Sequence, residues 1–499
     1  MSRFALISFS LLLIFALSAR GQEPRAGNIS FEPYSFKTYD PQEHPAQLGK
    51  LWVTENRGEK NGRLIQLAFV RLKTTAANPQ PPIVFLAGGP GVPGTGMGRV
   101  PVYFHLFARL QEIADVILLD QRGTGLSTPN LQCPPRKGLA ADTWEAKEKA
   151  TQALVELVHA CAEHWRAQGV DLAAFNTNAS ADDLEDLRRA LGAESISLLG
   201  HSYGTELALA AVRRHGEHLH SVVLASVQGP DDDLKLPAVT EFGLRRLGRF
   251  VAEDSAVNHD VPDLTGSLKQ GFARLGQQPA ALPFTDPATG KSVTLRGGKF
   301  ALQFLVETRL KDGRSVPVLP AVVATVARGD YSLFAPLVAR LHQGFSNLSI
   351  MQFPMTCSHG VSVERRAVAA RQASQTLLGD PSDLALDPKL CAEVGNPDLG
   401  PEFRSPVWST VPTLFLSGSM DSETPPSNAE NIRWGFPNSV HIVVENGFHE
   451  TLPASEVQDI VVDFFKGQDV SARRITFARP VFLSIEQAKA QLLAPSNPH

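Results

Sequence analysis

Short, continuous apolar runs that stop at glycine-rich or polar segments constrain the fold of this chain most. Six such runs occupy residues 83–86, 116–119, 196–199, 222–225, 413–416 and 441–444. Runs of this length without polar alternation are typical of strands that are buried on both faces, as in parallel sheets covered by helices. The connecting segments fit this pattern, because residues 182–191 carry acids in the first turn of an amphipathic helix and bases in the last. The sequence therefore predicts an α/β fold with a mostly parallel sheet and helices on both faces.

The strand pattern pauses in the second half of the chain. Residues 231–405 are mainly helical in character, with 241–253 and 301–310 as examples. A long helical insertion between two strands of one sheet is most simply a cap over the edge of the sheet. We therefore expect a core in two parts, residues 22–230 and 406–499, separated by a helical cap over 231–405.

The N-terminal segment has the layout of a secretory signal peptide. Arg3 precedes an almost wholly apolar run over residues 4–19, and the small residues Ala19 and Gly21 fit a cleavage site. The alternative is an uncleaved membrane anchor, but the run is shorter than the roughly 20 residues of a spanning helix. We expect residues 1–21 to be removed, leaving an exported protein, periplasmic or secreted, without stable membrane insertion.

Composition and charge exclude several classes of protein. With 43% hydrophobic and 20% charged residues, the chain is neither disordered nor fibrous. Its formal net charge of −4 lacks the basic excess that is typical of a nucleic-acid binder, so we expect no nucleic-acid partner.

The predicted export makes the four cysteines candidates for disulfide bonds, because disulfides form in oxidising compartments. Of the three possible connectivities, the pairing of sequence neighbours is favoured, Cys133 with Cys161 and Cys357 with Cys391. A zinc site is the alternative, but neither Cys-x-x-Cys nor His-x-x-x-His spacing supports it, and we expect no metal.

A Gly-x-Ser-x-Gly pentapeptide, Gly200–Gly204, lies directly after an apolar run and before a helical segment over 205–215. In that context the glycines allow a sharp strand-to-helix turn that exposes the hydroxyl of Ser202 as a nucleophile. The backbone N–H of Tyr203 would then face a developing oxyanion. Without the flanking strand and helix, the pentapeptide could occur by chance.

A serine nucleophile needs a base and an acid, which on this type of fold follow it in the order acid, then histidine. Asp421 follows the run 413–416, and His449 follows the run 441–444. Because the carboxyl ends of parallel strands meet at one edge, these two residues are the favoured partners of the serine. Glu423 and His441 are the rival acid and base.

A second glycine-rich segment, Gly88–Gly91, follows the first buried run. It could cradle a phosphate, but Pro90 and Pro93 remove N–H donors, and no Gly-Lys-Ser/Thr motif follows. We interpret it as the other half of an oxyanion hole, with the N–H of Gly89 as donor. Arg122, in a turn rich in glycine, is expected to form a buried structural ion pair.

Five motifs together resemble the α/β-hydrolase serine peptidases of the prolyl aminopeptidase and tripeptidyl aminopeptidase group. The motifs are Gly88–Gly91, Asp120–Ser127, Gly200–Thr205, Gly418-x-x-Asp421-x-x-Thr424-Pro425 and Gly447–His449. The resemblance implies a catalytic triad of Ser202, Asp421 and His449, a helical cap between strands six and seven, and cleavage of short peptides from their N-terminus. In these peptidases cap carboxylates hold the free amine of the substrate. Candidates here are Glu241, Glu307, Glu364 and Glu393.

The sequence thus predicts an exported serine hydrolase without a cofactor, acting as an aminopeptidase on short peptides. A carboxylesterase that uses the same triad on small acyl esters is the first alternative. A non-catalytic binding protein on a hydrolase fold is the second. The residue preference and the oligomeric state stay open.

Overall fold

The computed structural model describes residues 24–60, 62–135, 138–286, 290–345, 348–381 and 383–493, so the predicted signal peptide over 1–21 lies outside the described residues. The strands are β1 (Ile29–Lys37), β2 (Glu43–Thr54), β3 (Leu64–Leu72), β4 (Gln80–Leu86), β5 (Ala114–Asp120), β6 (Ile196–His201), β7 (Leu219–Ala225), β8 (Ala280–Thr285), β9 (Ser292–Gly297), β10 (Thr413–Gly418), β11 (Ser439–Glu445) and β12 (Ile475–Thr476). The helices are α1 (Gly94–Gly98), α2 (Pro101–Gln111), α3 (Lys147–Arg166), α4 (Thr177–Ala190), α5 (Tyr203–His215), α6 (Pro237–Glu253), α7 (Leu264–Gln277), α8 (Lys299–Leu310), α9 (Leu319–Arg328), α10 (Phe334–Phe345), α11 (Gln352–His359), α12 (Val363–Ala373), α13 (Pro388–Val394), α14 (Gly400–Arg404), α15 (Pro426–Arg433), α16 (Ser455–Phe465) and α17 (Ile485–Leu493).

One ten-stranded sheet organises the core, in the order β1-β2-β3-β5-β4-β6-β7-β10-β11-β12. The pairs from β1 to β5 are antiparallel, and every pair from β5 through β12 is parallel. All six runs that were expected to form buried strands lie in this parallel part. The mostly parallel sheet of the predicted fold class is therefore confirmed.

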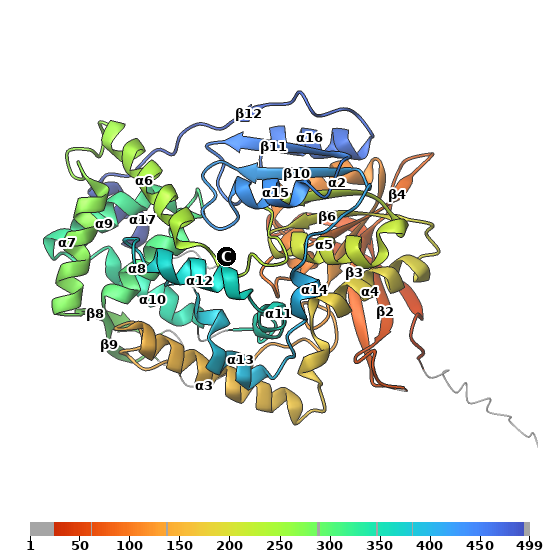
Figure 1. Cartoon of the computed structure of the whole chain (residues 1–499), viewed down its shortest axis with the longest axis horizontal. Helices are drawn as coiled ribbons and strands as arrows, with labels where there is room; N and C mark the ends of the chain where they lie inside the picture. The colour runs from red at the N-terminus through yellow and green to blue at the C-terminus, as the bar shows by residue number, and fades with distance from the viewer. Residues whose placement is uncertain are drawn as a thin grey trace, which may run out of the picture.

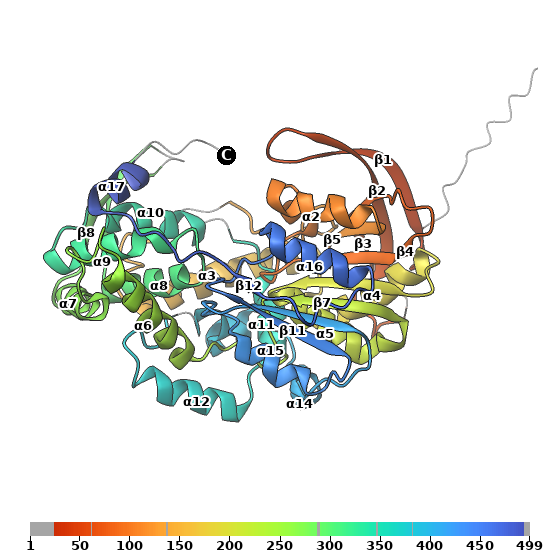
Figure 2. The same ribbon diagram turned by 90° about the horizontal axis from the view of Figure 1, so that it is seen from above.

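Hydrophobic packing on both faces explains why the parallel strands have no polar alternation. In β4, Val84 and Leu86 belong to the cluster on one face, while Ile83 and Phe85 belong to the cluster on the other. Helices α2 and α16 cover the second face, and α4 and α5 cover the first (Figure 2). The loops that follow the carboxyl ends of the central strands carry the candidate site.

A long insertion between β7 and β10 forms a separate layer beside the sheet, at the left of Figure 1. It is mainly helical but also contains the antiparallel hairpin of β8 and β9. The insertion follows the seventh strand of the main sheet rather than the expected sixth, because residues 29–72 form three strands whose number the sequence pattern did not resolve. The C-terminal helix α17 returns to this layer and contacts α9.

Two disulfides join segments on the insertion side of the molecule. Cys133 pairs with Cys161 on α3, and Cys357 on α11 pairs with Cys391 on α13, with Cα–Cα distances of 5.2 and 5.4 Å. Both pairs are the ones expected from sequence. Helices α3 and α13 also pack against each other, and each of the two helices carries one cysteine of a bridge.

The helix predicted over residues 182–191 begins five residues earlier, at Thr177. The side chain of Asn176 accepts a hydrogen bond from the N–H of Ala179 and thereby caps the helix. Within the described part of the chain, no helix is both long and apolar enough to cross a membrane.

Candidate active site

Ser202 occupies a strained turn between β6 and α5. Its φ and ψ angles are 55° and −126°, a conformation that a non-glycine residue rarely adopts. The turn fits only because its neighbours are small: a Cβ atom on Gly204 would lie 2.0 Å from the carbonyl oxygen of Leu86. The pentapeptide therefore forms the sharp strand-to-helix turn that its glycines predicted.

The three residues proposed as a triad meet at the carboxyl edge of the sheet. Nε2 of His449 lies 3.0 Å from Oγ of Ser202, and Nδ1 of His449 lies 2.9 Å from Oδ2 of Asp421. All three side chains are buried. The distances suit proton transfer from the serine to the imidazole, and a carboxylate that orients the imidazole from its other nitrogen.

Asp421 is held in place by the residues that follow it. The backbone N–H groups of Glu423 and Thr424 each donate to Oδ1 at 2.9 Å, and the hydroxyl of Thr424 donates to Oδ2 at 2.6 Å. Burial would raise the pKa of Asp421, but the neighbouring His449 and these hydrogen bonds lower it overall. The carboxylate is therefore ionised at neutral pH. The supporting role of Thr424 was not predicted, although the residue belongs to a motif noted in the sequence.

The rival acid and base are engaged elsewhere. Glu423 forms an ion pair with Lys311 at 2.7 Å, and its carboxylate lies 3.9 Å from Nε2 of His449 rather than at Nδ1. His441 contacts Glu430 on α15 at 2.5 Å and Ser417 on the neighbouring strand β10 at 3.0 Å. Neither residue is placed to orient the His449 imidazole.

The pH dependence of activity follows from the surroundings of His449. Burial would lower its pKa, but Asp421 raises it, to about 9 overall. Because the base must be neutral, we expect kcat/KM to rise about tenfold per pH unit below pH 9 and to level off above it. A pH–rate profile measures this with a stable substrate that has no free amine, because an α-amino group itself titrates at about pH 8. A plateau that begins near the ordinary histidine value of about 6.5 would contradict the predicted coupling to Asp421.

The residues of the two predicted oxyanion donors, Gly89 and Tyr203, lie near the serine. Gly88 and Gly89 line the same pocket as Ser202, and a Cβ atom on Gly88 would lie 2.9 Å from Cβ of Ser202. Tyr203 is the first residue of α5, where backbone N–H groups have no partner in the helix. This arrangement is compatible with a pair of N–H groups that converge on a substrate carbonyl.

Buried polar contacts fix the loops behind this pocket. Oδ1 of Asp120 accepts a hydrogen bond from the N–H of Thr95 at 2.8 Å, which anchors the segment that follows the glycine-rich loop. Arg122 is fully buried and donates to both carboxylate oxygens of Asp183, at 2.7 and 2.8 Å. The structural ion pair predicted for Arg122 is therefore confirmed.

The pocket above Ser202 has a volume of about 330 Å³ and is closed on one side by the insertion. Thr308, Lys311, Asp312 and Arg314 line it from the end of α8 and the following loop. The N–H of His449 donates to the carbonyl oxygen of Lys311 at 3.0 Å. The insertion thus contacts His449 directly, which the sequence pattern did not reveal.

The four carboxylates suggested from sequence as amine-binding groups are not among the residues that line this pocket. Glu241 pairs with Arg245 at 2.9 Å, and Glu393 contacts His159 at 2.7 Å. Glu364 lies in the first turn of α12, and Glu307 lines a smaller neighbouring cavity. The pocket instead contains Glu450, which directly follows His449 in the sequence and could have been noticed there.

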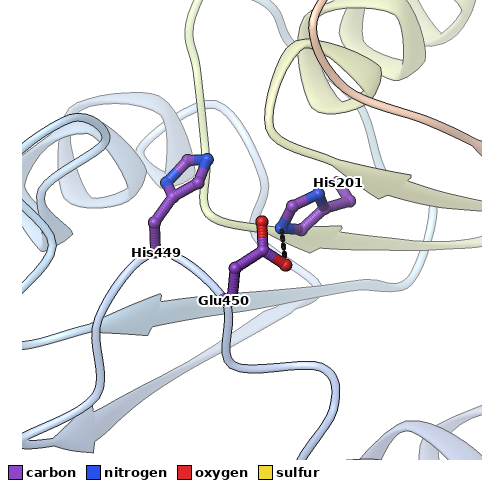
Figure 3. Close-up of side chains that lie close together, drawn as sticks. All are labelled: His201, His449 and Glu450. Atoms are coloured by element: carbon purple, nitrogen blue, oxygen red, sulfur yellow. Dashed lines mark ion pairs between the residues drawn. The ribbon is translucent and has the colours of Figure 1, made fainter. Parts of the chain in front are cut away.

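Two groups of described residues could hold a metal ion. Each has ligand atoms within 4.8 Å of one another; the groups are His201, His449 and Glu450 (Figure 3), and Glu206, Asp233 and His359. In the first group a metal would occupy His449, which already contacts Ser202 and Asp421. In the second, His359 already lies between two carboxylates, forming ion pairs with Asp233 and with Glu206, the latter at 3.2 Å. Both groups are therefore explained by contacts within the chain.

Comparisons with known proteins agree with this geometry. A tripeptidyl aminopeptidase of Streptomyces coelicolor is 30% identical over 198 residues, covering 38% of this chain and 36% of that protein. The serine protease Hip1 of Mycobacterium tuberculosis is 26% identical over 366 residues, covering 69% of this chain and 64% of that protein. The putative hydrolase YuaR of Escherichia coli is 26% identical over 177 residues, covering 35% of this chain and 33% of that protein. Each match thus spans less than two thirds of the relative. Residues 81–453 match the alpha/beta hydrolase fold family, and the chain belongs to that family.

Proposed function

We propose that this protein is an exported serine hydrolase that acts as an aminopeptidase on short peptides. The observation that carries the hydrolase part is the hydrogen-bonded series from Ser202 through His449 to Asp421, with distances of 3.0 and 2.9 Å. The relatives named as tripeptidyl aminopeptidase and serine protease support the peptidase part. The apolar N-terminal segment and the two disulfides support export.

The proposed reaction follows from the contacts. Oγ of Ser202 attacks the substrate carbonyl carbon while its proton passes to Nε2 of His449, and Asp421 stabilises the imidazolium. The N–H groups of Gly89 and Tyr203 bind the oxyanion of the tetrahedral intermediate. His449 then gives the proton to the leaving amine, the C–N bond breaks, and an acyl-enzyme forms. A water molecule, deprotonated by His449, hydrolyses the ester and restores Ser202.

A matched pair of substrates separates the peptidase from an esterase. If the enzyme recognises a free N-terminal amine, N-acetylation should lower kcat/KM, because the carboxylate that binds the amine loses its charge partner. Breaking such a buried pair costs about 2–5 kcal/mol, which corresponds to a loss of roughly 30- to 5000-fold. The measurement compares free and N-acetylated aminoacyl and tripeptidyl 4-nitroanilides. Equal rates on both members, or hydrolysis of acyl esters without any amide hydrolysis, would favour the carboxylesterase.

A further inference from the structure

The charges in the catalytic pocket are not balanced. Three carboxylates line it, from Asp312, Glu423 and Glu450. Asp312 pairs with Arg314 at 3.2 Å, and Glu423 pairs with Lys311 at 2.7 Å. Within the described residues, no ion pair joins Glu450 to a lysine or an arginine. Glu450 is therefore the one pocket carboxylate in this part of the chain that lacks such a cationic partner.

Glu450 is held so that only one of its oxygens is engaged. The hydroxyl of Tyr103 donates to Oε2, and Nε2 of His201 lies 3.6 Å from the same oxygen. Figure 3 shows the carboxylate between the imidazoles of His201 and His449, with the ion pair to His201 drawn to one oxygen. Among the described residues, no hydrogen bond or ion pair reaches Oε1 of Glu450. The buried Tyr103 thus fixes the side chain and leaves Oε1 for another group.

The neighbouring imidazoles do not remove the negative charge in the active enzyme. Burial lowers the pKa of His201, so this ring is neutral at neutral pH. His449 must also be neutral to act as the base. Burial opposes the ionisation of Glu450, but any positive charge on His201, the hydrogen bond from Tyr103, any positive charge on His449 and the charge of Arg314 lower its pKa overall. When both imidazoles are neutral, the partly buried carboxylate keeps only the charge of Arg314, which forms its ion pair with Asp312. A bound ammonium group would offset the remaining cost of this burial.

We propose that Glu450 binds the α-ammonium group of the substrate, a role that rests on the proposed aminopeptidase function. Its position also indicates how many residues are released. A carboxylate oxygen of Glu450 lies within 4.8 Å of a ring nitrogen of His449, whose Nε2 lies 3.0 Å from Oγ of Ser202. The amine of the residue under attack is one carbon from the carbonyl, whereas the amine of a tripeptide lies two residues, or about 7 Å, farther away. Recognition by Glu450 therefore favours the release of single N-terminal residues.

The test compares wild type with Glu450→Gln on alanine ethyl ester and propionic acid ethyl ester, which differ only in the amine, and on alanine and tri-alanine 4-nitroanilides. We expect Glu450→Gln to lower kcat/KM for the alanine ester by at least about 30-fold and to leave the propionic ester nearly unchanged. Glu450→Asp, which keeps the charge, should retain part of the preference for the alanine ester over the propionic ester. Glu456→Gln, an exposed position at the start of α16, serves as the matched control and should change neither rate.

The outcomes separate this inference from the proposed function. If wild type hydrolyses the esters but no anilide, the peptidase function fails, while the ester pair still tests Glu450. Equal losses on both esters in Glu450→Gln would show that the residue acts through His449 or the fold, and would overturn the inference. An unchanged preference for alanine would overturn it too. Release of intact tri-alanine, with no cleavage of alanine 4-nitroanilide, would contradict the removal of single residues.

Discussion

Replacement of Ser202 by alanine is expected to leave a folded protein whose kcat is lower by a factor of about 10⁴ or more. The substitution removes one oxygen atom and, with it, the hydrogen bond of 3.0 Å to Nε2 of His449. Without the hydroxyl no acyl-enzyme can form, so only the binding and oxyanion contributions to the rate survive. The measurement is kcat on the best chromogenic substrate, with circular dichroism and thermal unfolding as checks of folding.

Ser197→Ala provides a matched control. Ser197 is also buried on β6, where its hydroxyl contacts that of Ser221 at 3.0 Å, away from the pocket. This variant should lose some stability, of the order of 1 kcal/mol for one hydrogen bond, and keep its turnover. A folded Ser202→Ala protein with near-normal turnover would contradict the proposed mechanism.

Asp421→Asn is expected to lower kcat by about 10⁴ because the amide no longer stabilises the imidazolium or enforces the tautomer that the base needs. The pKa of His449 should also fall, since Asp421 is what raises it to about 9. The residual activity of the variant should therefore reach its plateau at a lower pH than that of wild type. This shift is a readout that simple loss of packing would not produce.

Glu423→Gln is the matched comparison for this variant. Glu423 lies two residues from Asp421 and close to His449, but its partner is Lys311. The Glu423→Gln substitution should lower kcat far less than Asp421→Asn does. A severe loss in Glu423→Gln together with a mild loss in Asp421→Asn would show that the two acids have the opposite roles.

Much of this arrangement could be predicted from local sequence. Buried parallel strands need apolar side chains on both faces, so runs such as 83–86 and 196–199 are visible without any alignment. The turn at Ser202 needs glycine where Gly204 meets the backbone of Leu86. Because strand ends converge at one edge, Asp421 and His449 could be placed beside the serine from chain order alone.

Features that depend on contacts between distant segments could not be predicted in this way. The early start of α4 depends on the N-cap formed by Asn176. In the sequence, the acidic turn that begins at residue 182 is the more obvious sign of a helix start. The contact of Lys311 with His449 joins the insertion to the core and leaves no periodic signal. The charge imbalance at Glu450 appears only after the partners of the other pocket carboxylates are known.

The central claim is that Ser202 is the nucleophile, and covalent labelling tests it most directly. A sulfonyl fluoride reacts with an activated serine hydroxyl, loses fluoride, and leaves a stable adduct that mass spectrometry can locate. We predict one adduct on the peptide that contains Ser202, with loss of activity in proportion to labelling and slower labelling as the pH falls below about 9. Complete inactivation with the adduct on another residue, or full activity with Ser202 labelled, would contradict the account.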